Sequence, residues 1–214
     1  WNFPNAGNPQ KVQRFPLEWA AAMRAMAAKK PEYFLPAHGL PIRGSEQIAK
    51  VLNNCALVLE HLVKETLSMM NEGARKNEIV HTVKVDQALL DLPYLRPLYD
   101  EPEFVINNIW RLYGGWYDGN PANLKPALES SLATEIANLA GGSLHLGNRA
   151  MEVADDKDFR LACHLIEYAV NSDPSNKLLH SIRSKIYQLR VAEESSLMSK
   201  GIFGHASRES KKIL

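Results

Sequence analysis

The sequence predicts a mainly α protein that opens with a short α/β segment. Apolar residues recur with helical spacing from Ser45 almost to the end of the chain, whereas a strand-like run occurs only at residues 32–36. Hydrophobic residues make up 45% and charged residues 23% of the 214 residues, as in an ordinary globular protein. A chain of this length and composition can bury a core in one or two domains.

The charge balance and the cysteine content exclude several classes of partner and site. The formal net charge is +1, so neither nucleic acid nor an anionic membrane surface is an expected partner. No apolar run approaches the roughly 18–20 residues that span a bilayer. Cys55 and Cys163 lie far apart in apolar helical patterns, which favours two buried thiols over a disulfide between them.

The α/β segment comes first along the chain. Residues 1–16 are rich in Pro and Gly and are predicted to form a loop, followed by a helix over residues 17–30. Residues 32–36 (EYFLP) then predict a short buried strand. The strand leads into residues 37–44 (AHGLPIRG), a loop that contains His38. A chain that begins Trp1-Asn2-Phe3-Pro4 is typical of the interior of a longer polypeptide, so no compartment is predicted.

A long helix is predicted from Ser45, a suitable N-cap, to Gly73, a suitable residue beyond the C-terminus. Its length would be roughly 40 Å at 1.5 Å per residue. Its apolar stripe predicts packing against the rest of the domain or a second subunit, in preference to a cofactor groove. The stripe consists of Ile48, Leu52, Cys55, Leu59, Leu62, Thr66 and Met69.

The second half of the chain predicts further helices. One begins at Asp100-Glu101-Pro102 and ends at Gly114-Gly115, before tight turns over residues 116–121. The segment from Ala162 to Pro174 is similar to the second helix of a tetratricopeptide unit, and a single helical hairpin is expected because no second copy follows at a 34-residue period. Three or four helices are predicted, near residues 129–140, 143–154, 158–171 and 175–198, and residues 201–214 are predicted to form a polar tail.

His38 is the sharpest candidate for a site residue. A neutral imidazole is a common zinc ligand, and a His between a strand and a Gly-containing loop is held rigidly and exposed. Taken alone, one His in a turn is more often a solvated side chain than a ligand. The surrounding residues favour the ligand interpretation because they carry a family resemblance.

Four segments resemble metallo-β-lactamase-fold hydrolases of the alkyl sulfatase family. Residues 35–44 (LPAHGLPIRG) are similar to the last metal-ligand segment of that fold. Residues 99–102 (YDEP) and 109–124 (IWRLYGGWYDGNPANL) resemble the alkyl sulfatase dimerisation domain, and residues 194–203 (ESSLMSKGIF) are similar to its terminal segment. The GWYDGNP run is the most specific of these, and the resemblance covers nearly the whole chain.

The resemblance implies a fold, a cofactor and an activity. Members of the family hold two zinc ions in an αββα sandwich, followed by a helical domain that dimerises, and hydrolyse alkyl sulfate esters with a metal-activated water. Residues 1–44 would then be a C-terminal remnant of the metal domain, and residues 45–200 the dimerisation domain. His38 would be the final zinc ligand, and the expected partners are a second copy of the chain and a small alkyl ester substrate.

Tyr113, Tyr117 and Asn120 are the candidates for substrate contact that the resemblance implies. A phenol can donate to a sulfate oxygen without adding a positive charge that would retain the product anion. Family members use a Tyr from this segment, and the sequence leaves open which of the two it is. The segment is expected to close over the metal centre that His38 faces, so that His38, Tyr113 and Tyr117 share one site. The alternative for both is packing beside Trp110 and Trp116. No residue of the chain is predicted to be catalytic by itself.

Two departures from the family pattern bear on function. The His-x-His-x-Asp-His metal motif is absent, and zinc sites need about three protein ligands, so the chain alone is expected to be inactive and the metal domain to be supplied by polypeptide outside it. An Arg-Gly pair usual near residues 5–14 is also missing; Gln10 and Lys11 fall near its place, and Arg14 is the nearest Arg. Two alternatives therefore stay open: a metal-dependent hydrolase of another ester, and a helical interaction module without catalysis.

Overall fold

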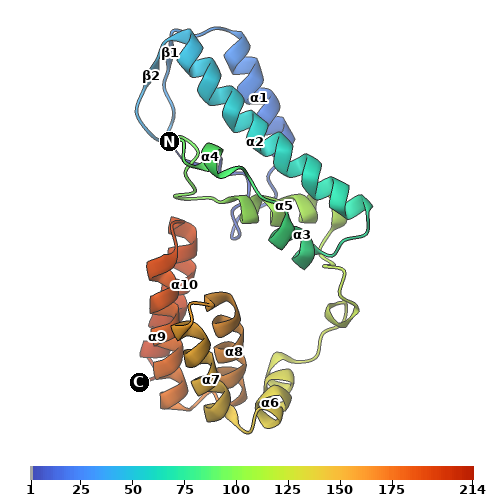
Figure 1. Ribbon diagram of the computed structural model, residues 1–214, viewed down its shortest axis with the longest axis vertical. Coiled ribbons are helices and arrows are strands. Elements are labelled where there is room, and N and C mark those ends of the chain that lie inside the picture. The colour runs from blue at the N-terminus through green and yellow to red at the C-terminus, as the bar shows by residue number, and fades with distance from the viewer. Residues whose placement is uncertain (1) are drawn as a thin grey trace. The chain divides into compact units, whose positions relative to one another are not determined.

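A computed structural model describes residues 2–214 and confirms the mainly α fold class. The chain forms two compact units, one reaching to Leu124 and one from Lys125 to Leu214 (Figure 1). The first unit contains α1 (Pro16–Ala28), β1 (Tyr33–Phe34), β2 (Ile42–Arg43), α2 (Ser45–Asn71), α3 (Lys76–Thr82), α4 (Gln87–Leu90), α5 (Pro102–Gly114) and the 3₁₀ helix η1 (Pro121–Asn123). The second contains α6 (Glu129–Leu139), α7 (Ser143–Asp155), α8 (Phe159–Ser172), α9 (Lys177–Glu193) and α10 (Leu197–Lys211).

The first unit is built on α2, and α1 runs beside it (Figure 1). Small buried residues, Ala20 and Ala27, let α1 approach closely. Arg24 of α1 reaches across the pair, its Nε donating to Glu60 Oε1 at 2.7 Å and its Nη1 to Asn53 Oδ1 at 3.3 Å. The predicted stripe of α2 is buried from Ile48 to Thr66, so this seam packs within its own unit.

The strand predicted to be buried is instead one half of an exposed β-hairpin. Tyr33 pairs with Arg43 and Phe34 with Ile42 in a two-stranded antiparallel ladder. Successive strand residues point to opposite faces, so only Phe34 and Ile42 pack on the first unit's apolar residues. Tyr33 and Leu35 are 58% and 74% exposed, because the described chain places no further layer over that face.

Asp100 fixes the loop before α1 against the start of α5. Its carboxylate is fully buried and accepts hydrogen bonds from the backbone N–H groups of Gly7 (2.6 Å), Asn8 (3.1 Å) and Glu101 (2.8 Å). Burial raises the pKa of Asp100, and the three N–H groups oppose that rise. A Cβ at Gly7 would lie 2.5 Å from the backbone carbonyl carbon of Phe104, so the loop approaches α5 too closely for any side chain at that position.

The second unit contains two successive helical hairpins where the sequence predicts one. The pairs are α7 with α8 and α9 with α10, and α9 begins 34 residues after α7. Gly147 of α7 lies against α9, where a Cβ would be 2.5 Å from Leu179 Cδ2. The close approach at a glycine resembles the packing expected of a tetratricopeptide-like pair.

Residues 201–214 do not form the predicted polar tail, since most of them belong to α10. The residues that α10 fully buries are Ser199, Ser207 and Ser210, and its apolar contacts with the core come from the partly buried Phe203 and Ala206, so its hydrophobic periodicity is weak. Hydrogen bonds add to this packing: Ser184 Oγ and Ser207 Oγ lie 2.9 Å apart, and Ser210 Oγ lies 3.1 Å from His180 Nδ1. A helix held by buried serines looks polar in the sequence although it is packed.

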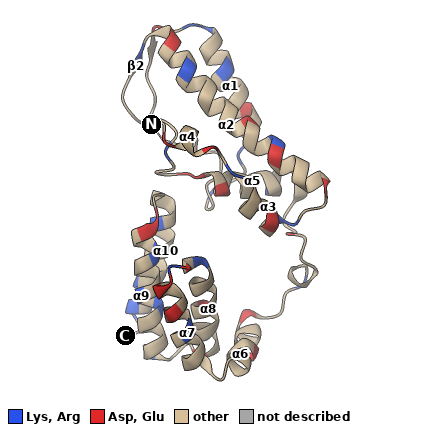
Figure 2. Cartoon of the chain, in the orientation of Figure 1, with Lys and Arg blue, Asp and Glu red and all other residues tan. Residues whose placement is uncertain are grey.

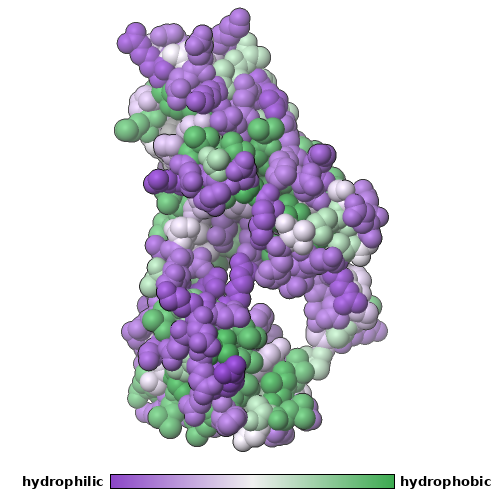
Figure 3. All heavy atoms as spheres, in the orientation of Figure 1, coloured by the Kyte–Doolittle hydropathy of each residue, from purple (hydrophilic) through white to green (hydrophobic). Residues whose placement is uncertain are grey.

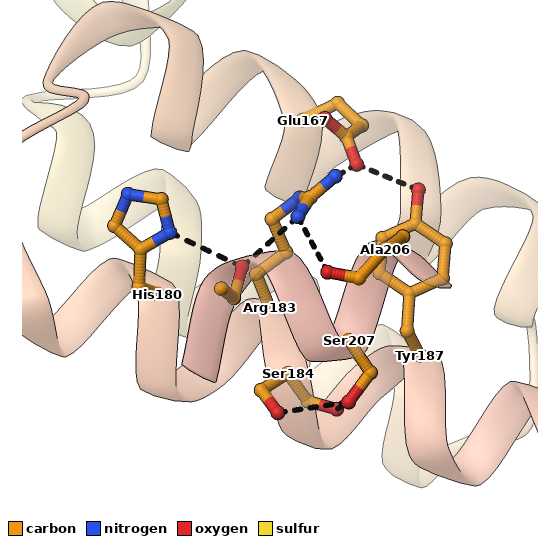
Figure 4. A network of polar contacts seen from close by, with 8 residues as sticks. Glu167, His180, Arg183, Ser184, Tyr187, Ala206 and Ser207 are labelled. Atoms are coloured by element: carbon orange, nitrogen blue, oxygen red, sulfur yellow. Dashed lines mark hydrogen bonds and ion pairs between the residues drawn. The ribbon is translucent and has the colours of Figure 1, made fainter. Parts of the chain in front are cut away.

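Arg183 of α9 is the centre of this polar network (Figure 4). Its Nη1 donates to the Ala206 carbonyl at 2.8 Å and to Ser210 Oγ at 2.9 Å, both on α10. Its Nε donates to Glu167 Oε1 of α8 at 2.8 Å, and the same oxygen accepts from the Tyr187 hydroxyl at 2.7 Å. The guanidinium of Arg183, which belongs to α9, thus forms hydrogen bonds to both α8 and α10.

Both cysteines are free thiols, as predicted. Burial raises the pKa of Cys55 to about 12 and is also the main cause that raises the pKa of Cys163 to about 11. At pH 8 about one Cys55 thiol in 10,000 is then a thiolate, the form that reacts with disulfide reagents. We expect an aromatic disulfide reagent to label the native chain very slowly and to label two thiols per chain in denaturant. Rapid labelling of Cys55 in the native state would contradict its burial.

The surface carries both signs of charge, and Figure 2 shows acidic and basic residues in each unit. No helix within residues 2–214 combines the length and the apolar character that crossing a bilayer requires.

Candidate functional site

His38 lies in the loop that joins β1 to β2, and its side chain is exposed. The loop is anchored at both ends, because Gly44 N donates to the Glu32 carbonyl at 2.9 Å just beyond the ladder. Gly39 follows His38 with φ of 103°, a conformation that strongly favours glycine. The hairpin therefore presents the imidazole on an exposed turn that is tethered at its two ends, and the exposure agrees with the prediction.

The chain's own residues do not complete a zinc site around His38. Within residues 2–214, no three His, Cys, Asp or Glu side chains are grouped so that they could hold a metal ion. A zinc site needs about three protein ligands, so His38 could serve only with donors from outside this chain. Its role as a ligand stays a prediction.

Tyr113 and Tyr117 lie at the end of α5 and in the segment after it. Tyr113 is 50% exposed, and Tyr117 is partly buried. Trp110 Nε1 donates to the Tyr117 carbonyl at 3.0 Å, which ties this segment back to α5. Tyr113 therefore lies at the surface of the first unit, where a ligand could reach it, and Tyr117 is less accessible. Their contact with substrate stays a prediction.

Asn120 belongs to a hydrogen-bonded turn that shapes the segment after α5. Its side-chain oxygen accepts from Ala122 N at 3.2 Å and so caps η1, while its own N–H donates to Asp118 Oδ1 at 2.9 Å. Asp118 Oδ2 accepts from Asn123 Nδ2 at 2.6 Å, and this bond is the main cause that lowers the pKa of Asp118. The structure thus gives Asn120 a role in turn geometry beside the predicted role in substrate binding.

The His38 hairpin and the tyrosine segment contact different parts of α2. Leu40, two residues after His38, lines a shallow pocket with Val51 in the first half of the helix. Gly114, which follows Tyr113, lies against Met70 near the end of α2, where an added Cβ would be 2.9 Å from Met70 Cε. Val51 and Met70 are about 28 Å apart along the helix at 1.5 Å per residue. The structure therefore does not bring His38 together with Tyr113 and Tyr117 in one pocket, contrary to the expectation of one shared site.

Sequence reasoning missed a cleft of the first unit. Its volume is about 470 Å³, and its walls come from the loop around Asn8 and from α5, with Trp110 and Arg111 among the lining residues. Arg111 is held by hydrogen bonds to Gln13 Oε1 at 2.8 Å and Asn108 Oδ1 at 3.2 Å. Only the folding of the loop onto α5 creates this cleft, so periodicity along the sequence gives no signal for it. None of the four predicted site residues lines it.

Comparisons with known proteins give consistent matches along the chain. The family model described as alkyl sulfatase dimerisation matches residues 75–212. A linear primary-alkylsulfatase from a Pseudomonas species is 28% identical over 176 residues, which cover 82% of this chain and 33% of that protein. An (R)-specific secondary-alkylsulfatase from a Pseudomonas species is 27% identical over 184 residues, which cover 84% of this chain and 28% of that alkylsulfatase.

The fold is shared with a solved structure. The stereoselective inverting sec-alkylsulfatase Pisa1 from a Pseudomonas species superposes with a TM-score of 0.92 at 22% identity, over 100% of this chain and 34% of that one. The chain thus spans about a third of the length of the relatives that it matches. The match to residues 75–212 includes Tyr113, Tyr117 and Asn120, and it does not include His38.

Proposed function

Because the chain belongs to the alkyl sulfatase dimerisation family, we propose that it is the C-terminal portion of a zinc-dependent hydrolase of sulfate esters. The family match over residues 75–212 carries this proposal. In it the chain contributes three things: a zinc ligand, His38; contacts to the substrate from the Tyr113–Asn120 segment; and the surface through which two copies associate. Because His38 and this segment do not share a pocket within one chain, they would meet one substrate only where a second copy or polypeptide outside this chain brings them together.

The placement of His38 supports its role as a ligand from the edge of a larger site. The imidazole is exposed on a tethered hairpin, and the remaining ligands would come from polypeptide outside this chain. When bound, zinc would lower the pKa of a water molecule to about 7 and polarise the ester oxygens. The contribution of this chain would be to hold one imidazole in a fixed position.

The tyrosines support a role in substrate binding because both belong to the first unit, next to a turn held by Asp118 and Asn120. A phenol hydroxyl can donate to a sulfate oxygen while leaving the site without extra positive charge. Since the structure leaves Tyr113 half exposed, it is the better placed of the two.

Chelation of metal tests the proposed activity. We expect the full-length protein to hydrolyse a medium-chain primary alkyl sulfate, and a strong chelator to reduce that turnover at least about 100-fold, because zinc would supply both the nucleophile and charge stabilisation. Added Zn²⁺ should restore it. Sulfate release in the presence and absence of chelator is the measurement. Turnover that chelation leaves unchanged would exclude the zinc-dependent mechanism.

The missing Arg-Gly pair favours testing other esters alongside sulfates. Residues 7–11 are Gly-Asn-Pro-Gln-Lys, so an Arg that would meet the sulfate is absent at that place. A panel that contains an alkyl sulfate, a phosphate monoester and a lactone distinguishes these substrates. If the protein hydrolysed only the phosphate ester or only the lactone, and a chelator stopped that reaction, the metal-dependent mechanism would stand and the proposed substrate class would be wrong.

A helical interaction module without catalysis is the second candidate function. The observation that favours it is the lack of a grouped set of metal ligands within residues 2–214. The same ester panel decides between the two, because a module would self-associate and turn over none of the substrates.

A further inference from the structure

Helix α6 buries small apolar residues and leaves its leucines exposed, and Ile136 is the large apolar residue of the helix that packs partly on the core. Ala133 and Ala137, four residues apart, are buried against the second unit. Leu128, the residue that precedes the helix as its N-cap, is 72% exposed, and Leu132 and Leu139 within the helix are 44% and 81% exposed. A helix that packs on one core is expected to bury its leucines first, since burial of apolar area is the main gain of packing. The arrangement in α6 is the reverse.

The three leucines form one row along the helix. Leu132 follows Leu128 by four residues and Leu139 follows Leu132 by seven, and at 3.6 residues per turn these spacings bring all three to one side. The buried alanines lie on a different side of the same helix. Figure 3 shows apolar atoms at the surface over the part of the chain that Figure 1 labels α6. Helix α6 therefore has two apolar faces, and the second unit covers one of them.

We propose that a second copy of this chain covers the leucine row of α6. This inference rests on the proposed self-association and names the residues that carry it. The family match that includes the whole of α6 is to a dimerisation model, which makes a copy of this chain the partner to expect. In a two-fold dimer each copy contributes the same patch, so one row of leucines on each chain supplies two contact surfaces.

Glu135 lies in the same row, three residues after Leu132 and four before Leu139, and its side chain is exposed. Its carboxylate is expected to stay at the solvent edge of the contact, because an unpaired carboxylate is costly to bury. The apolar centre of the contact would then come from the leucines, with a polar rim around it, as in protein interfaces generally.

The test places two carboxylates in the row, in the variant Leu132→Glu with Leu139→Glu. We expect the unchanged chain to be a dimer, with a light-scattering mass near twice the 24.0 kDa of one chain, and the variant to have a dimer dissociation constant at least about 100-fold higher. Both side chains are exposed within one chain, so helicity measured by circular dichroism should be unchanged. Sedimentation of both proteins over a range of micromolar concentrations gives the two dissociation constants.

Leu197→Glu is the matched control. Leu197 is 62% exposed at the start of α10, where a carboxylate is favourable at the N-terminus of a helix, and we expect this variant to remain a dimer. A double variant that dimerises as tightly as the unchanged chain would overturn the proposal. A monomeric unchanged chain would overturn self-association itself, whereas loss of ester hydrolysis with an intact dimer would affect only the proposed activity.

Discussion

Replacing His38 by Ala in the full-length protein is expected to lower the rate of sulfate-ester hydrolysis by about 100-fold or more. A zinc ion held by about three protein ligands loses affinity and geometry when one of them is removed, and even residues that only orient a ligand are worth about 10–100-fold. The stability of the chain should change little, because His38 is exposed in a loop. Steady-state turnover of an alkyl sulfate and the zinc content per subunit are the two measurements.

His145→Ala is the matched control for this variant. His145 is an exposed histidine on α7, in the other compact unit, and its replacement is expected to leave turnover and zinc content unchanged. If His38→Ala retained full activity and its full zinc content, the assignment of His38 as a ligand would be wrong. The family membership would be unaffected, because the match begins at residue 75.

Replacing Asp100 by Ala is expected to destabilise the first unit by about 3–5 kcal/mol. The substitution removes the acceptor of the Gly7 and Asn8 N–H groups, which lie in a buried environment, and each unsatisfied buried donor costs about 1–3 kcal/mol. It also leaves a cavity where the carboxylate was, which adds to the loss. The loop before α1 should detach from α5, because these bonds join segments more than 90 residues apart in sequence.

Urea unfolding followed by circular dichroism measures this loss as a lower midpoint of the transition. The control is Asp91→Ala, since Asp91 is exposed and accepts one hydrogen bond from Gln87 Nε2 at 2.8 Å. We expect the control to change the free energy of unfolding by less than about 0.5 kcal/mol. Equal midpoints for the two variants would show that the buried carboxylate does not anchor the loop.

The sequence predicted most helices because their inner faces are apolar. The ends predicted for α2, α5 and α6 agree with the structure within a few residues: a proline begins α5, and a glycine with positive φ follows both α2 and α6. The N-cap of α2 is Gly44, and the predicted cap, Ser45, is the first residue of the helix. Helix α10 was missed because it buries serines. Its partners, His180 and Arg183, lie at least 23 residues earlier in the chain, and no local pattern reveals such a pairing.

The candidate site could be predicted only in part, for a similar reason. The position of His38 on an exposed turn follows from its Gly- and Pro-rich surroundings. The aromatic run at residues 32–36 did not reveal that Tyr33 is exposed. Whether a strand is buried depends on the helices or strands that other parts of the polypeptide pack against it. The cleft beside Arg111 depends on contacts between residue 13 and α5, which are remote in sequence.

The bonds of Arg183 have a consequence for how the second unit opens. If α10 peeled away, the guanidinium would lose the Ala206 carbonyl and the Ser210 hydroxyl together, while still bonded to Glu167. Local unfolding of α10 therefore costs more free energy than the loss of a few exposed residues would, because both hydrogen bonds of Arg183 to this helix break. Amide protons of α8, α9 and α10 should then exchange with solvent in a single cooperative event, with the last helix as protected as its neighbours.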